Sequence, residues 1–324
     1  MNTYTDPIEV VDLAVSYGRV TALDGLGLRI AAGTVLGVLG PNGAGKTTLI
    51  RVLSTLLRPT RGTARVMGHD VVADPLPVRR SIGLAGQYAA VDQELTGREN
   101  LEMVGRLYRL PRAEARRRAG EILERFDLSG AADRRVGTYS GGMRRRLDLA
   151  AGLTGRPPVL LLDEPTTGLD PRSRQELWSI VDELRDAGTT VLLTTQYLDE
   201  ADRLAQRIAV IAAGTVIAEG TPDTLKAGIG TDILHLHLPE PAALATAVPL
   251  LADLAAAGTT VTADPVSGDL TVHVSRPDAS AEALRRLDRH GVTVATIQLT
   301  RPSLDDVFLS LTGRSATAVP EEAR

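Results

Sequence analysis

The sequence predicts an α/β fold with a mainly parallel sheet, and two observations lead to it. Residues 159–162, 191–194 and 208–211 are short, strongly apolar segments, as expected for strands that are buried on both faces of a parallel sheet. Residues 34–39 form a further apolar strand that runs into a glycine-rich loop, and leucines at helical spacing follow this loop as far as Pro59. Strands that alternate with helices in this way form a parallel sheet with crossover helices.

Two subdomains are expected beside this sheet. Residues 8–39 contain short apolar segments broken by glycines such as Gly18 and Gly25, which predicts strands joined by tight turns. One of the two subdomains is expected to be an antiparallel β subdomain. Apolar side chains recur at helical spacing in residues 97–153, which predicts an inserted helical subdomain of about residues 88–153.

The chain changes character after Gly228, where a small α+β domain is expected. Its segments read as strand, helix, strand, strand, helix, strand and a short helix with Ser303 at the N-cap. His235 and His237 share one face of the first strand, and with no third ligand nearby we expect exposed polar positions and not a metal site. The predicted domains are residues 1–228, residues 229–313 and a flexible tail of residues 314–324.

Composition excludes several classes of protein. The 324 residues include no cysteine, so a disulfide framework, a thiolate metal site and a cysteine nucleophile are impossible. The net charge of −4 and the 3% aromatic content argue against a nucleic-acid partner. The arginine runs at residues 116–118 and 144–146 are expected to be solvated helix faces. No signal peptide is expected, and no apolar stretch reaches the ~18 residues that span a bilayer.

Residues 40–47, Gly-Pro-Asn-Gly-Ala-Gly-Lys-Thr, fit the phosphate-loop pattern at every specified position, between a predicted strand and a predicted helix. The glycines let backbone N–H groups turn inward around an anion at the start of a helix. Lys46 is expected to reach the β- and γ-phosphates, and the Thr47 hydroxyl to ligate Mg²⁺. The loop therefore predicts that the chain binds a nucleoside triphosphate.

Asp163 and Glu164 end the apolar run of residues 159–162, where a buried strand emerges beside the phosphate loop. Asp163 suits the Mg²⁺ shell, and Glu164 suits a general base that polarises the attacking water and accepts its proton. An apolar run before Asp-Glu is common by itself. Its pairing with a phosphate loop makes hydrolysis of the nucleotide a specific prediction.

Residues 139–143, Tyr-Ser-Gly-Gly-Met, precede a second helical run and admit two interpretations. Serine and glycine both start helices well, so the segment can be a helix cap. It can also be a second anion site, because Ser140 and the amides of Gly141 and Gly142 at a helix N-terminus suit a γ-phosphate. Since one chain rarely needs two such sites for one phosphate, the second interpretation implies a nucleotide held by another copy of the chain.

Together these motifs resemble those of one family, the nucleotide-binding subunits of ATP-binding-cassette (ABC) transporters. The resemblance covers residues 8–226, and the motifs stand in the family's order. Residues 40–48 look like the Walker A loop, residues 140–142 like the core of the family signature, and residues 159–163 like the Walker B strand. The resemblance implies a P-loop NTPase (ABC ATPase) core, with ATP and Mg²⁺ as its ligands.

The resemblance also implies roles for single residues. Gln87 is placed like the glutamine of the loop that senses Mg²⁺ and the γ-phosphate, and Gln196 stands at the switch position. Asp170 lies in a segment like the loop that couples two sites, and Tyr17 is placed like the aromatic residue that stacks on adenine. The implied catalytic residues are Glu164, Gln87 and Gln196. The implied nucleotide contacts are Tyr17, Gly40, Asn42, Gly43, Ala44, Gly45, Lys46, Thr47 and Thr48, with Ser140, Gly141 and Gly142 in trans. The implied Mg²⁺ ligands are Thr47, Gln87 and Asp163.

Subunits of this family work as head-to-tail dimers around two ATP molecules, which would explain the second anion site. The sequence departs from the family pattern at Tyr139 and Met143, where leucine and glutamine are usual, and at Gln196, where histidine is usual. These departures and the ending at residues 302–309 are similar to the daunorubicin/doxorubicin-resistance branch of actinobacterial drug exporters.

That resemblance implies a homodimer that drives a separate integral-membrane permease, with a drug or antibiotic-like compound as cargo. The chain would then lie at the cytoplasmic face of the membrane, held peripherally by the permease. Its C-terminal domain would regulate or stabilise the dimer. Two rival hypotheses stay open from the residues alone, a soluble member of the same superfamily that acts on ribosomes or nucleic acid, and a protein that sequesters the drug.

Overall fold

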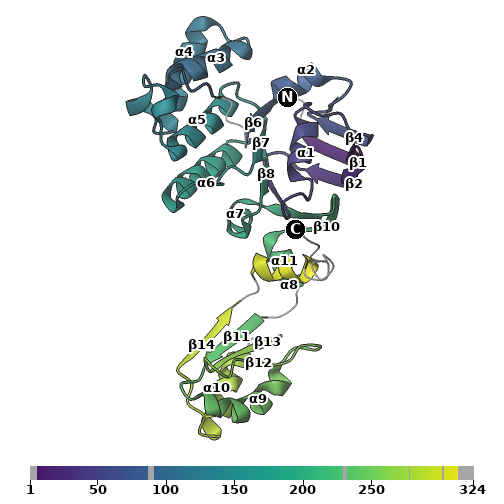
Figure 1. The fold of residues 1–324 in the computed structure, drawn as a ribbon, viewed down its shortest axis with the longest axis vertical. Helices are drawn as coiled ribbons and strands as arrows, with labels where there is room; N and C mark the ends of the chain where they lie inside the picture. Colours follow the sequence, from purple (N-terminus) through teal and green to yellow (C-terminus); the bar gives the residue numbers. More distant parts are fainter. Residues whose placement is uncertain (1–5, 87–90, 229–231, 277, 301–302, 313–324) are drawn as a thin grey trace, which may run out of the picture. The chain divides into compact units, whose positions relative to one another are not determined.

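The computed structural model describes residues 6–86, 91–228, 232–276, 278–300 and 303–312. Two compact units make up the chain, Met1–Pro222 and Asp223–Arg324. In the first unit, Figure 1 shows a strand-rich part and a helical part on either side of a central sheet. The predicted nucleotide-site residues that the structure describes all belong to this unit.

The antiparallel sheet of the first unit has the strand order β2-β1-β4-β5. Its strands are β1 (Ile8–Tyr17), β2 (Val20–Ile30), β4 (Arg61–Val66) and β5 (His69–Asp70). The predicted turn at Gly18 joins β1 to β2, but the turn expected at Gly25 is absent, because this residue continues β2 with φ of +68°. Glycine adopts a positive φ without the strain that a Cβ would cause, so the pattern of glycines overstated the number of turns.

The central sheet has the order β10-β9-β3-β8-β7-β6. Its strands are β3 (Val35–Leu39), β6 (Ile82–Ala85), β7 (Val159–Asp163), β8 (Thr190–Thr195), β9 (Arg207–Ala212) and β10 (Thr215–Gly220). All pairs are parallel except β9 with β10, a hairpin that the sequence analysis did not predict. Because β8 lies between β3 and β7, the carboxyl ends of these three strands meet at one edge of the sheet.

Helices of the first unit connect the strands or form the helical part. They are α1 (Lys46–Leu53), α2 (Pro75–Ser81), α3 (Gly97–Leu107), α4 (Arg112–Arg125), α5 (Gly141–Leu153), α6 (Pro171–Asp186) and α7 (Leu198–Leu204). The prediction that α1 reaches Pro59 was wrong. The helix ends at Leu53, because Thr55 is left-handed with φ of +64° and the N–H groups of Leu56 and Leu57 both turn back to Arg51 O. Residues 97–153 are mostly helical, as predicted.

The second unit contains the predicted order of strands and helices. Helix α8 (Pro222–Gly228) begins at the boundary between the units, and the elements after it are β11 (Asp232–His237), α9 (Leu244–Leu251), β12 (Thr262–Ala263), β13 (Asp269–Val274), α10 (Ala279–Arg289), β14 (Thr296–Thr300) and α11 (Leu304–Thr312). The four strands form an antiparallel sheet, β12-β13-β11-β14. Ser303 caps α11 as predicted, since its Oγ accepts the Asp306 N–H at 3.2 Å. His235 is exposed, and His237 pairs with Asp269 at 2.8 Å.

Candidate functional site

The predicted phosphate loop joins β3 to α1 and depends on glycine at two places. A Cβ on Gly40 would lie 2.4 Å from Ile211 O, and a Cβ on Gly45 would lie 2.5 Å from Ala22 O. Gly45 also has φ of +107°, which L side chains rarely adopt. Any larger residue would therefore push the loop out of its place between β2 and β9.

The Lys46 side chain crosses this loop. Its Nζ donates to Gly40 O at 2.7 Å and to Pro41 O at 3.2 Å, and it lies 3.5 Å from Glu164 Oε1. The side chain is only 4% exposed. The ammonium is thus fixed inside the loop beside the catalytic carboxylate predicted from the sequence, where it can bind phosphate oxygens.

Asp163 ends β7 and is buried, with 4% of its surface exposed. Its Oδ1 accepts a hydrogen bond from Thr194 Oγ1 at 2.6 Å and another from Thr47 Oγ1 at 3.3 Å. Thr194 stands on the neighbouring strand β8, and sequence reasoning did not identify it. Carboxylate and hydroxyl oxygens are hard donors that suit Mg²⁺, so Thr47 and Asp163 fit the predicted metal site.

Glu164 follows β7 in an unusual conformation for a non-glycine residue, with φ of +50°. Its N–H donates to Thr194 O at 2.9 Å, and its Oε2 accepts from Thr167 Oγ1 at 3.4 Å. The side chain is 8% exposed and faces Lys46 Nζ. A backbone strained in this way persists only where the surroundings hold it, which is common at active sites.

Of these side chains, Lys46, Thr47 and Glu164 line a cavity of about 490 Å³, and Asp163 lies next to it through its contact with Thr47. Gln196, which follows β8 and is exposed, lines the same cavity. The full lining is Ala22, Pro41, Asn42, Gly43, Gly45, Lys46, Thr47, Thr48, Glu164 and Gln196. Sequence reasoning missed Ala22, which lies on β2 and has no motif of its own. Tyr17 does not line the cavity, and its side chain is 45% exposed at the end of β1.

The predicted signature residues lie elsewhere in the unit. Ser140 caps α5, with its Oγ accepting the Met143 N–H at 3.2 Å, so the helix-cap interpretation is correct for the chain by itself. Ser140 and Gly141 are exposed and do not line the cavity. A Cβ on Gly142 would lie 2.7 Å from Ser173 Oγ, so the signature packs against the start of α6.

Asp170 caps α6 and also lies outside the cavity. Its carboxylate accepts the N–H of Ser173 at 3.0 Å and the hydroxyl of the same residue at 2.7 Å. These hydrogen bonds lower the pKa of Asp170 from its ordinary value. The remaining predicted residue, Gln87, lies outside the described residues.

The prediction of solvated arginine faces was wrong for residues 144–146. The side chains of Arg145 and Arg146 are only 16% and 14% exposed, because they donate to backbone carbonyls inside the unit. In the other run, Arg116 and Arg117 are exposed as predicted, but Arg118 is only 17% exposed and donates to Leu153 O, so the prediction was wrong there too. Arg145 contacts the backbone of Asp163 and Glu164, and no motif in the sequence had identified it.

Comparison with known proteins shows the family. A model of the ABC transporter family matches residues 23–167, and a model of the C-terminal domain of DrrA1-3-like ATP-binding proteins matches residues 220–312. The chain is 54% identical over 317 residues to the daunorubicin/doxorubicin resistance ATP-binding protein DrrA of Streptomyces peucetius, a match that covers 98% of this chain and 96% of that protein. The chain belongs to the ABC transporter ATP-binding proteins of this resistance branch.

Further relatives agree with this ABC assignment. The daunorubicin resistance ATP-binding protein DrrA3 of Streptomyces coeruleorubidus is 57% identical over 299 residues, covering 92% of this chain and 93% of that protein. A solved dimeric ATP-binding cassette, in a post-hydrolysis state with ADP and Pi, is 27% identical with a TM-score of 0.61, covering 66% of this chain and 98% of that one.

The fold class and the family predicted from the motifs are therefore confirmed. The chain is an ABC ATPase that binds ATP, and it is the ATP-binding subunit of a drug-resistance or export transporter. Subunits of this kind work with a separate membrane component. Among the helices that the structure describes, none is long and apolar enough to cross a membrane.

Proposed function

We propose that two copies of this ABC subunit close head to tail on two ATP molecules with Mg²⁺ and so drive a separate permease, which exports a drug or antibiotic-like compound. One observation carries the proposal. Lys46 and Glu164 line the cavity, whereas the exposed groups of Ser140 and Gly141 at the start of α5 do not. A second chain in the opposite direction supplies the signature groups that the cavity lacks.

Hydrolysis in this closed site follows from the groups around the cavity. Lys46 would bind the β- and γ-phosphates, and Gln196 would donate an N–H to the γ-phosphate. Thr47 and Asp163 would hold Mg²⁺, which neutralises charge on the phosphate oxygens. Glu164 would orient a water molecule and accept its proton as the water oxygen bonds to the γ-phosphorus and the bond to ADP breaks. Gln87 would sense whether Mg²⁺ and the γ-phosphate are present.

The head-to-tail dimer can be tested with a substitution that preserves the helix cap. Ser140→Asp keeps an N-cap acceptor for Met143, so α5 is expected to stay folded, but it places a negative charge against the partner's γ-phosphate. In a Glu164→Gln background, size-exclusion chromatography with ATP should show a dimer that Ser140→Asp abolishes. Ser179→Asp adds the same charge at an exposed position of α6 and should keep the dimer. A dimer that survives Ser140→Asp would contradict the proposal.

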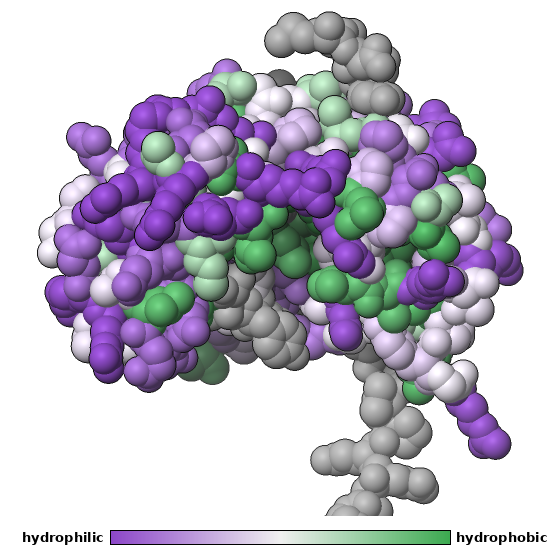
Figure 2. Space-filling model, turned by 90° about the horizontal axis from the view of Figure 1, so that it is seen from above, coloured by the Kyte–Doolittle hydropathy of each residue, from purple (hydrophilic) through white to green (hydrophobic). Residues whose placement is uncertain are grey.

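A second feature supports the separate permease. A cleft of about 680 Å³ lies between the sheet part and the helical part of the first unit. Three of its four leucines are unusually exposed for their type, with 63% for Leu56, 62% for Leu76 and 76% for Leu107. On the face seen from above, Figure 2 shows hydrophobic side chains gathered in a hollow with hydrophilic residues around it. Exposed apolar side chains that gather in one groove are typical of a surface that binds a partner.

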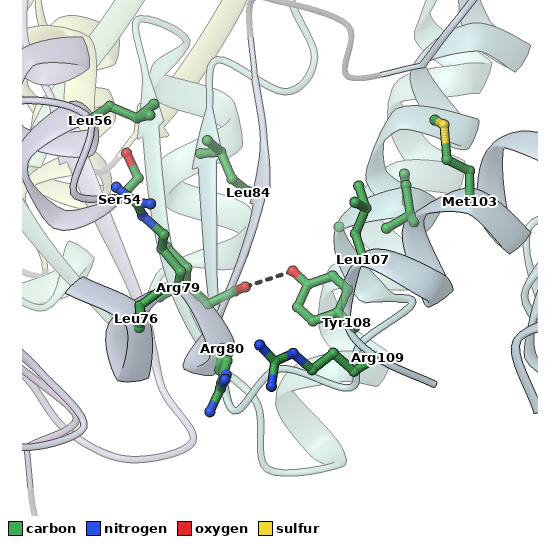
Figure 3. Close-up of a pocket in the computed structure, with 14 residues that line it drawn as sticks. Ser54, Leu56, Leu76, Arg79, Arg80, Leu84, Met103, Leu107, Tyr108 and Arg109 are labelled. Atoms are coloured by element: carbon green, nitrogen blue, oxygen red, sulfur yellow. Dashed lines mark hydrogen bonds between the residues drawn. The ribbon is translucent and has the colours of Figure 1, made fainter. Parts of the chain in front are cut away.

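Charge at one end of the cleft indicates what the partner carries. Figure 3 shows Arg80 and Arg109 at that end, near the ring of Tyr108, whose hydroxyl donates to Ile82 O at 3.0 Å. The Arg79 guanidinium lies beside Ser54, and its Nε donates to Thr55 Oγ1 at 2.6 Å. In the described part of the chain, the side chains of Arg80 and Arg109 form no hydrogen bond and no ion pair. We infer that an amphipathic helix of the permease with an acidic residue enters the cleft.

The cleft can be tested by membrane recovery of the full chain from its native cells. Burying a leucine contributes about 1.5–3 kcal/mol, so Leu107→Asp should reduce membrane-bound chain about tenfold or more while ATP affinity stays unchanged. Val266→Asp, at a site 87% exposed in the second unit, is the matched control. Equal recovery of both variants would show that the cleft does not hold the permease. Recovery of the chain only with ribosomes or nucleic acid would instead favour the rival hypothesis of a soluble ATPase.

A further inference from the structure

Arg145, in the second turn of α5, donates to four backbone carbonyls of the nucleotide site. Its Nε donates to Pro165 O at 2.6 Å, and its Nη2 donates to Glu164 O at 2.7 Å and to Asp163 O at 3.3 Å. Its Nη1 donates to Gly86 O. One guanidinium thus holds both the segment that carries the catalytic carboxylates and the residue before Gln87.

This arrangement suits arginine and no other side chain. The planar guanidinium has five N–H donors in a fixed fork, whereas lysine has a single ammonium. Asp148, 1% exposed, lies 3.8 Å from Nη1 and accepts the Gly86 N–H at 3.4 Å, so a buried carboxylate balances the charge. Burial lowers the pKa of Arg145, but a guanidinium stays protonated in proteins.

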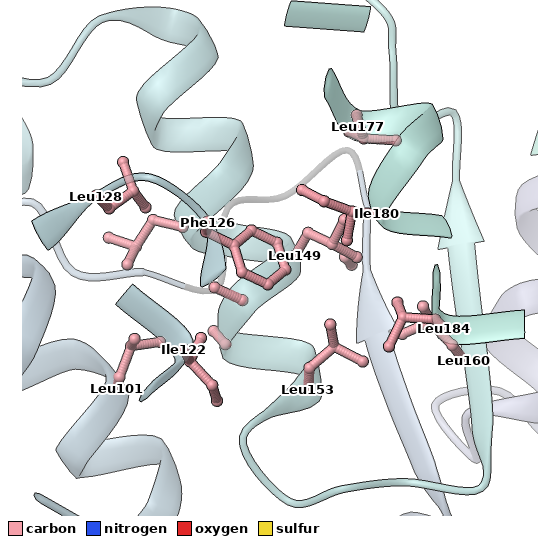
Figure 4. Close-up of a cluster of buried hydrophobic side chains, with 14 of the residues drawn as sticks. Leu101, Ile122, Phe126, Leu128, Leu149, Leu153, Leu160, Leu177, Ile180 and Leu184 are labelled. Carbon is pink, nitrogen blue, oxygen red and sulfur yellow. The ribbon is translucent and has the colours of Figure 1, made fainter. Parts of the chain in front are cut away.

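Helix α5 is itself firmly packed, so its two ends move together. Leu149 belongs to the same buried cluster as Phe126, and Figure 4 shows both side chains in the middle of that cluster. On the sheet side, a Cβ on Gly83 of β6 would lie 2.2 Å from Gly152 O, which leaves no space between this strand and the helix. Protein interiors packed in this way transmit small displacements instead of absorbing them.

Resting on the head-to-tail dimer proposed above, we propose that Arg145 is a positioning residue that couples the two nucleotide sites of the dimer. Helix α5 begins at the signature, where Ser140 meets the partner's nucleotide. The carbonyls held by Arg145 belong to the segment of Glu164, beside the chain's own nucleotide. A shift of the signature turn therefore moves the backbone of the catalytic base, and each site responds to the state of the other.

The test compares Arg145→Gln with Arg146→Gln in the full chain. Arg146 is the adjacent residue and is equally buried, but it donates to Phe126 O and pairs with Glu176, away from the cavity. Arg145→Gln should keep the affinity of each protomer for a fluorescent ATP analogue. Its kcat should fall about 100-fold, as expected for a small misplacement of the base, and the Hill coefficient for ATP should fall from about 2 to about 1. Arg145→Lys should recover part of both losses.

Each other outcome has a definite meaning. If Arg145→Gln and Arg146→Gln lower the folded fraction alike, with kcat and Hill coefficient per folded protomer unchanged, Arg145 is merely structural and the proposal is wrong. If Glu164→Gln forms the ATP dimer but Arg145→Gln hydrolyses ATP with normal cooperativity, only the coupling is wrong. If Glu164→Gln stays monomeric with ATP even with the permease present, the head-to-tail dimer is wrong and the coupling is wrong with it.

Discussion

Glu164→Gln is the substitution from which the site's geometry makes the most specific prediction. The change keeps the shape of the side chain and removes a charge 3.5 Å from Lys46 Nζ. At an effective dielectric constant of 20, the attraction between these two charges is about 5 kcal/mol. Both side chains are buried, with 4% and 8% exposed, so loss of solvation offsets most of that attraction.

Two opposite effects on ATP are expected from this one change. ATP must draw Lys46 away from Glu164 and place its γ-phosphate near the carboxylate, so the glutamine variant should bind ATP more tightly. A net gain of about 1.4 kcal/mol corresponds to tenfold in affinity. Turnover should fall by about 10²–10⁴, because the general base is lost. Lys46→Ala, in contrast, should lose affinity as well as turnover.

The assay combines titration with a fluorescent ATP analogue and steady-state release of phosphate. Glu183→Gln removes an exposed carboxylate of α6 that pairs with Arg125, and it should change neither quantity. Weaker binding of ATP by Glu164→Gln would refute the idea that ATP and the Glu164 carboxylate compete for Lys46. Turnover within a few-fold of the original chain would refute Glu164 as the base.

Two further predictions concern pH. Gln196 lines the cavity and cannot carry charge, so the ATPase profile should gain an inflection near pH ~6.5 only in Gln196→His; a profile of unchanged shape would count against contact with the γ-phosphate. Burial raises the pKa of Glu200, which accepts from Trp178 Nε1 at 3.2 Å. A raised carboxyl pKa stabilises the fold below its unfolded value of about 4.3, and this stability is lost as pH rises through the folded pKa. The free energy of unfolding should therefore decline less with pH in Glu200→Gln than in the original chain. Urea unfolding followed by the fluorescence of Trp178, the only tryptophan, measures this free energy. Equal slopes of the free energy against pH in the two proteins would contradict the prediction.

The sequence was sufficient for the elements whose causes are local. The phosphate loop, the apolar strands and the cap at Ser303 each follow from a short pattern, and the structure contains them at the expected places. The end of α1 was not predictable, because a left-handed Thr55 has no signal in composition. Thr194 was missed for another reason: its contact with Asp163 exists only because β7 and β8 pair in one register.

The buried arginines of α5 show why a run of charges is a poor guide to the surface. Backbone carbonyls that follow the last residue of a strand have no partner in the sheet, yet they need a donor once they are buried. Glu164 and Pro165 are in that situation after the end of β7, and Arg145 also donates to the carbonyl of Asp163, the last residue of the strand. A loose backbone here would misplace the proposed base, Glu164. Only a long side chain with several donors reaches all of them from a neighbouring helix. Arg145 is therefore buried because its guanidinium supplies the hydrogen bonds that these carbonyls require. Wherever a parallel strand delivers catalytic carboxylates to a sheet edge, an arginine on the facing helix is therefore a candidate for the same positioning role.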